Sequence, residues 1–190
     1  MVRRGRTRFS RLAGIEHLEA RQLLAADLVV SEFMAINESG LADQDGDFED
    51  WIEIHNSSQQ SVSLQGWALT DEPDNLTRWQ FPDVTLAAGQ YQVVYASGKD
   101  RTDPANELHT NFKLSGDGEF LALVQSDGIN IEYSFSPEFP PQVRDVSYGV
   151  SADQSLTGFF TVPSPGAANL QVPLDDPLRT LVINEIAVIR

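Results

Sequence analysis

Three closely spaced aspartates are the residues of this sequence best suited to hold a ligand. Asp43, Asp45 and Asp47 alternate along the stretch DQDGD, and carboxylate oxygens at this spacing are ligands that calcium prefers. A standard EF-hand loop needs glycine sixth and glutamate twelfth, whereas a count from Asp43 puts Gly46 fourth and Ile54 twelfth. Two interpretations remain. We expect a solvated turn built by aspartate and glycine, and a calcium site on these three aspartates is the only cofactor candidate.

Carboxylates just after this turn could support acid–base catalysis, but no complete catalytic pattern accompanies them. Glu49, Asp50 and Glu53 lie close enough in sequence to supply a carboxylate pair. The chain has no cysteine, which excludes disulfides, thiolate metal sites and cysteine nucleophiles. It also contains no nucleophile elbow, P-loop or dinucleotide fingerprint. The sequence therefore predicts no catalytic residues and no enzyme.

Three tryptophans could instead form a stacking platform for carbohydrate. Trp51, Trp67 and Trp79 all stand in strand-like segments. Tryptophans in such positions more often fill the core of a β-sandwich, because burial of the ring is strongly favourable. We expect all three in the core.

The elements that must position these residues are short strands. The clearest are residues 28–34, 51–54, 91–95, 119–124 and 129–135. Turn signals recur about every 8–12 residues, and no helical period follows residue 27, which together predict an all-β fold, an antiparallel β-sandwich. Residues 119–124 and 129–135 should form a hairpin, with Ile129, Ile131, Tyr133 and Phe135 facing inward.

The charge of the chain is divided very unevenly. Residues 1–26 contain six arginines and two acids, whereas residues 27–190 contain seven basic and 26 acidic residues. An acidic surface of this kind repels nucleic acid, so we expect no nucleic-acid partner. No run approaches the roughly 18 apolar residues that a membrane-spanning helix needs.

The basic leader, residues 1–26, has a pattern of its own. Its apolar residues predict a short helix over residues 15–25, outside the sandwich. The stretch HLEARQLLAA at residues 17–26 resembles the LEPRxLL motif found near the N-termini of large bacterial surface and exported proteins, with Ala20 in place of the proline. That resemblance implies a surface-directed protein.

One internal repeat is visible near the end of the chain. The stretch LVVSEF at residues 28–33 is echoed by LVINEI at residues 181–186. We therefore expect a sandwich domain over residues 28–169, a linker at 170–180 and the start of a truncated second repeat at 181–190. The chain would then be part of a multidomain protein.

Several strand motifs together resemble the lamin tail domain family. They are DWIEIHN at residues 50–56, LQGWALTD at 64–71, WQFP at 79–82 and TVPSPGAA at 161–168. The resemblance implies an immunoglobulin-like β-sandwich over roughly residues 28–169, and structural roles for Asp50 and Glu53, which lie in the first motif. Bacterial members of the family are accessory modules of exported, often multidomain proteins.

These observations favour a non-enzymatic binding or scaffolding module of an exported or cell-surface bacterial protein. Its partner would be a protein or a cell-surface polymer. One alternative is the accessory N-terminal domain of a larger exported enzyme, a hydrolase or a spore-coat-type kinase. Another is an adhesion domain stabilised by calcium at Asp43, Asp45 and Asp47.

Overall fold

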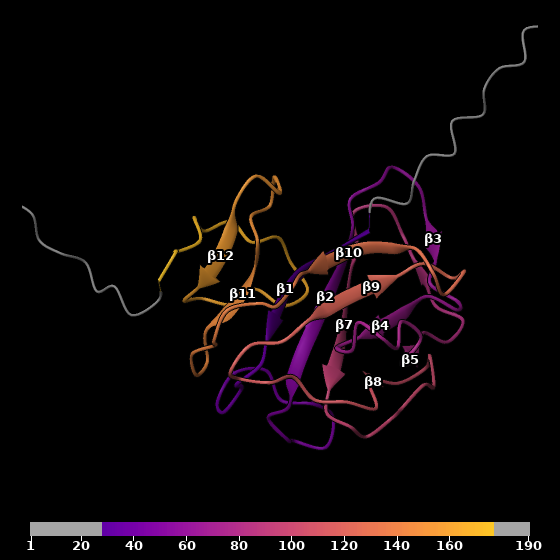
Figure 1. Cartoon of the computed structure of the whole chain (residues 1–190), viewed down its shortest axis with the longest axis horizontal. Helices are drawn as coiled ribbons and strands as arrows, with labels where there is room; N and C mark the ends of the chain where they lie inside the picture. Colours follow the sequence, from indigo (N-terminus) through magenta and orange to yellow (C-terminus); the bar gives the residue numbers. More distant parts are fainter. Residues whose placement is uncertain (1–27, 177–190) are drawn as a thin grey trace, which may run out of the picture.

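The structure is a computed structural model that describes residues 28–176, and every regular element in this part is a β-strand (Figure 1). The strands are β1 (Leu28–Met34), β2 (Asp50–Asn56), β3 (Val62–Ser63), β4 (Ala68–Thr70), β5 (Trp79–Gln80), β6 (Thr85–Leu86), β7 (Tyr91–Ala96), β8 (Leu108–His109), β9 (Leu121–Val124), β10 (Ile131–Phe135), β11 (Ser147–Val150) and β12 (Thr157–Phe160). The predicted helix at 15–25 and the repeat at 181–190 lie outside the described residues.

The strands form an immunoglobulin-like sandwich, as predicted. A six-stranded sheet, ordered β12-β11-β1-β2-β7-β8, packs against a four-stranded sheet, ordered β10-β9-β4-β5. β3 and β6 form a separate small pair. Within the described part, the pairing of β7 with β8 is parallel and the other strand pairings are antiparallel. The predicted hairpin is also confirmed, because β9 pairs with β10.

The core lies between the two larger sheets. Phe33 of β1 and Ile52 and Ile54 of β2 point into it and are fully buried. The ring of Phe33 contacts Phe135 and Phe139, with centroids 5.2 and 4.6 Å apart. Such aromatic pairs add specific geometry to the gain from burying apolar surface.

The opposite face of the six-stranded sheet is also covered. Because side chains alternate along a strand, the neighbours of the core residues point outward, and Met34, Trp51 and Tyr95 form a second buried cluster there. Leu41 packs on this cluster. All seven residues of β1 are therefore buried. The expected burial of the three tryptophans is confirmed, although Trp51 lies in this outer cluster and not between the sheets.

One predicted orientation is wrong. Ile129 and Ile131 are 74% and 44% exposed, not inward-facing. The register of β10 against β9 shifts between Ile131 and Tyr133, and an extra residue reverses which face the following side chains occupy. Tyr133 and Phe135 beyond the shift do pack on the core.

A second register shift, in the pairing of β1 with β2, lies between Val30 and Glu32. Gly149 of β11 lies opposite Glu32. A Cβ at Gly149 would lie 2.2 Å from the Ser31 carbonyl oxygen and 2.8 Å from the Glu32 Cα. Only glycine therefore allows β11 to lie this close to β1.

We expect Gly149→Ala to lower the free energy of unfolding by about 2–3 kcal/mol, because backbone atoms cannot move aside cheaply. Urea denaturation measures the change. The control is Gly46→Ala, which meets no atom within 4 Å but has a positive φ of 85°. That control should cost only about 1 kcal/mol of backbone strain. Equal losses in the two variants would contradict the steric explanation.

Candidate functional site

The acidic turn at residues 43–47 folds around the carboxylate of Asp43. That side chain is buried, and its Oδ1 accepts hydrogen bonds from the backbone N–H groups of Asp45 and Asp47, both at 2.9 Å. The Gly46 N–H donates to the Asp43 carbonyl at 2.9 Å. Aspartate and glycine form this turn because a short carboxylate can cap its own backbone and glycine tolerates a positive φ.

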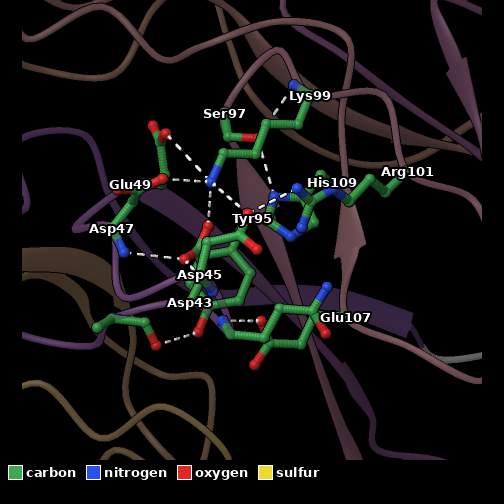
Figure 2. Close-up of polar contacts among 12 residues, drawn as sticks. Asp43, Asp45, Asp47, Glu49, Tyr95, Ser97, Lys99, Arg101, Glu107 and His109 are labelled. Carbon is green, nitrogen blue, oxygen red and sulfur yellow. Dashed lines mark hydrogen bonds and ion pairs between the residues drawn. The ribbon is translucent and has the colours of Figure 1, made fainter.

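Lys99 and Arg101, which follow β7, provide the counter-charges for the turn (Figure 2). The Lys99 Nζ contacts the carboxylate of Asp43 and lies 2.8 Å from Asp47 and 3.2 Å from Asp45. The Arg101 Nη2 donates to Asp45 at 2.6 Å. The three aspartates do converge, with carboxylate oxygens within 4.8 Å of one another, and the chain's own ammonium lies against all three.

The pKa values of Asp43 and Lys99 reflect the ion pair between them. Burial acts to raise the pKa of Asp43, but hydrogen bonds from Lys99 and from the turn backbone outweigh it and lower that pKa. Burial likewise acts to lower the pKa of Lys99, and its hydrogen bonds to Asp43, Asp47 and Asp45 raise it above its usual value. The cluster is therefore an ion-pair network that ties residues 43–49 to the segment after β7.

Sequence reasoning missed Lys99 and Arg101. Lys99 is 56 residues from Asp43, and no local pattern connects the two. The sequence predicted a solvated turn, whereas the structure buries Asp43, and a buried aspartate requires a compensating charge or hydrogen-bond donors. With Lys99 in place, a calcium ion at Asp43, Asp45 and Asp47 would have to displace an ammonium ion.

A buried serine–histidine pair lies near the turn, but the serine lacks the features of a catalytic nucleophile. Ser97 Oγ and His109 Nδ1 are 2.9 Å apart, and both residues are buried. The Ser97 hydroxyl also accepts the Lys99 backbone N–H at 3.1 Å. No group in the described part of the chain bonds the other ring nitrogen, so no carboxylate orients the ring as in a catalytic triad. The imidazole instead stacks on Tyr95, with centroids 5.1 Å apart.

The three carboxylates considered for acid–base work have different partners. Glu49 accepts a hydrogen bond from the Lys113 Nζ at 2.9 Å. Burial raises the pKa of Asp50 to about 7, against hydrogen bonds with the backbone of Leu114 and Asn37. Glu53 lies elsewhere, beside Glu32 of β1. The structure therefore does not gather Glu49, Asp50 and Glu53 into one site.

Glu32 and Glu53 form a fully buried carboxylate pair on the outer face of the six-stranded sheet. They are direct partners across β1 and β2, and both are 0% exposed. Glu53 accepts hydrogen bonds from the Ser31 hydroxyl at 2.7 Å and from the Gly166 N–H. Glu32 accepts hydrogen bonds from the Ser147 hydroxyl and from the Ser164 N–H, the latter at 3.1 Å.

This pair holds the closing segment, residues 161–169, across the sheet. Burial raises the pKa of Glu53 to about 7 and also raises that of Glu32, because no Lys or Arg side chain of the described part contacts either carboxylate. Glu32 was not singled out from the sequence. A glutamate beside a serine, in a strand whose other residues are apolar, was the signal that could have identified it.

Comparison with known proteins places this geometry in a family. A family model described as Lamin Tail Domain matches residues 24–136. The match includes the acidic turn, Lys99, Arg101 and the β9–β10 hairpin, and it ends before β11, β12 and the closing segment. No curated protein matches the chain.

We expect Lys99→Met to lower the free energy of unfolding by about 1–2 kcal/mol, because it leaves the buried Asp43 carboxylate without a cation. Millimolar calcium should then raise the melting temperature of this variant and leave that of the natural chain unchanged. Differential scanning fluorimetry with calcium or chelator measures both effects.

The control is Lys113→Met, which removes a 61% exposed side chain that pairs with Glu49. We expect little loss of stability and no response to calcium from this variant. A natural chain stabilised by calcium as strongly as the Lys99→Met variant would show that Lys99 does not block the three aspartates.

Glu53→Gln tests the buried carboxylate pair. The folded state holds the Glu53 proton up to a pH of about 7, whereas the unfolded state releases it near 4.5, so the contribution of Glu53 to stability is lost as the pH rises through this window. Glutamine carries no charge to bury. We expect the stability of Glu53→Gln relative to the natural chain to increase by about 1–3 kcal/mol from pH 4.5 to pH 8.

Urea denaturation across this pH range measures the change, and comparison with the natural chain cancels the opposing contribution of His109, whose pKa is lowered by burial. Glu138→Gln, which alters an exposed carboxylate, is the control. A pH-independent difference between Glu53→Gln and the natural chain would show that Glu53 does not titrate within the fold.

Proposed function

Because the chain belongs to the lamin tail domain family, we propose that it is a non-enzymatic binding or scaffolding module of an exported or cell-surface bacterial protein. Lamin tail domains are non-catalytic immunoglobulin-like domains that act in protein interactions. The observation that carries the proposal is that the polar groups of the two carboxylate clusters already have partners within the domain. Lys99 pairs with the carboxylates of the acidic turn, and the closing segment covers Glu32 and Glu53, so the polar groups of both clusters are bonded within the domain.

The leader supports the proposed location outside the cell. Its resemblance to the LEPRxLL motif and its arginine-rich start are features of bacterial surface proteins. The acidic remainder of the chain favours solubility and repels nucleic acid, which supports a protein or a cell-surface polymer as the partner. No helix of residues 28–176 combines the length and apolar character required to cross a membrane.

A second candidate is the accessory N-terminal domain of a larger exported enzyme, which agrees with the multidomain organisation that the repeat at residues 181–186 predicts. In that case a hydrolase or spore-coat-type kinase domain would follow in the same protein, and this chain would still act by binding. The position of Lys99 argues against the third candidate, a calcium-stabilised adhesion domain, because its ammonium already contacts the carboxylates of Asp43, Asp45 and Asp47.

Binding to the surface of the producing cells tests the proposal. We expect the fluorescently labelled full chain to bind intact cells saturably, and the same chain denatured by heat not to bind. Prior digestion of the cells with a protease distinguishes the partners, because it removes a protein and spares a polymer. Absence of saturable binding would contradict the proposal.

A further inference from the structure

The edge of β7 is uncovered over half of its length. β2 pairs with all six residues of β7, but on the other side β8 pairs only with Val94 and Tyr95. Residues 91–93 therefore have no strand beside them on that edge within the described part of the chain. Backbone groups on an uncovered edge are free to pair with an added strand.

A groove of about 580 Å³ runs along this edge. Val93 and Tyr95 of β7 form its floor, Pro165 and Gly166 of the closing segment form one wall, and Glu107 lies in the loop opposite. Its volume is in the range of protein ligand clefts. Val93 is partly exposed, so an apolar side chain can reach the floor.

The walls of the groove are fixed by hydrogen bonds that join distant segments. The Glu107 carboxylate accepts the Gln44 backbone N–H at 2.6 Å, which links the loop before β8 to the acidic turn. The Tyr95 hydroxyl donates to the Ala42 carbonyl at 2.9 Å. The Gly166 N–H donates to Glu53 from the other side. A partner therefore meets a preformed site and does not have to order the loops, which lowers the cost of binding.

The groove is negatively charged. Glu107 lines it, whereas neither Lys nor Arg does. The nearby cations, Lys99 and Arg101, are engaged with the acidic turn (Figure 2). The pKa of Tyr95 on the floor is raised to about 12, mainly by burial and further by the charges of Glu107 and Asp43. The electrostatic potential at the floor of the groove is therefore negative, which favours a cationic ligand.

We propose that this edge and groove bind an extended segment of a partner protein that carries an aliphatic and a basic side chain two residues apart, because side chains two apart on a strand point to the same face and can both reach the groove. The segment pairs with the backbone of residues 91–93 as a short added strand. Its aliphatic side chain packs on Val93 and Pro165, and a lysine or arginine side chain pairs with Glu107. The Gln92 amide, which donates to the Val93 carbonyl at 2.8 Å, gives way to the incoming strand. This inference rests on the proposed binding function and names the partner class.

The test uses the full chain labelled with ¹⁵N and a blocked lysine–valine hexapeptide in which valine, lysine and valine are separated by single serines, so that valine and lysine share one face of the strand. We expect titration to shift the backbone amide signals of Tyr91, Val93 and Glu107, with affinity that falls as sodium chloride is raised. A glutamate–valine hexapeptide should not bind. A lysine–valine hexapeptide with alternate backbone nitrogens methylated should also fail, because it cannot add a strand.

A pair of matched variants locates the contact. Glu107→Gln keeps an oxygen for the Gln44 N–H and removes the charge, and we expect it to bind the lysine–valine peptide about three- to tenfold more weakly. Glu138→Gln removes an exposed carboxylate and should bind as the natural chain does. Equal affinities in the two variants, or signal shifts confined to other surfaces, would overturn the groove assignment.

Cell binding separates the two proposals. Saturable binding of the full chain to cells, together with no binding of the lysine–valine peptide, would overturn the groove inference and leave the binding function standing. Absence of cell binding would contradict the proposed function, whatever the peptide does.

Discussion

The six-stranded sheet has to be covered on both of its faces, and the remaining features of the domain follow from this constraint. β1 contributes Phe33 to the space between the sheets and Met34 to the opposite side, so neither face can be left to water. The four-stranded sheet covers one face. On the other face, two irregular segments replace a third layer, residues 35–49 and the closing segment at 161–169. Irregular segments bury little apolar surface, and polar contacts therefore have to hold them in place.

The domain satisfies the carboxylates of these contacts in two ways. At the edge of the sheet, where water is near, Asp43 is paired with Lys99, and the long lysine side chain keeps part of its length exposed. In the middle of the sheet, no cation of residues 28–176 pairs with Glu32 or Glu53, and burial raises the pKa of both carboxyls. An ammonium ion would be costly to desolvate there, whereas hydroxyl and N–H donors from Ser147, Ser164 and Gly166 satisfy the oxygens.

Local patterns in the sequence were sufficient for the fold and insufficient for the contacts between its covering segments. Short strands with regular turn signals predicted the sandwich and the β9–β10 hairpin, and the usual burial of tryptophan in strands predicted that of the three tryptophans. The alternation of apolar residues failed at Ile129 and Ile131, because a single register shift reverses the side-chain direction and leaves no local mark. The turn at Asp43, Asp45 and Asp47 was recognisable from its composition. The cation that pairs with this turn was not recognisable, because Lys99 comes close to it only when the strands are paired. The contact of Glu32 with Ser164 was not recognisable either, because it spans 132 residues.

The recognition that we propose for this domain accordingly lies at a strand edge. The carboxylates of the acidic turn, Glu107 and Glu53 already bond to groups of the domain itself. These contacts hold the loops on the sheet. Fixing those loops also shapes what remains open: Glu107 is held toward the groove by Gln44, and Gly166 is held beside it by Glu53. Backbone pairing at an uncovered strand edge supplies affinity with little dependence on sequence, and the wall charges supply selectivity. The same polar contacts that close the outer face of the sheet thus border residues 91–93 of β7, where we propose that a partner segment pairs.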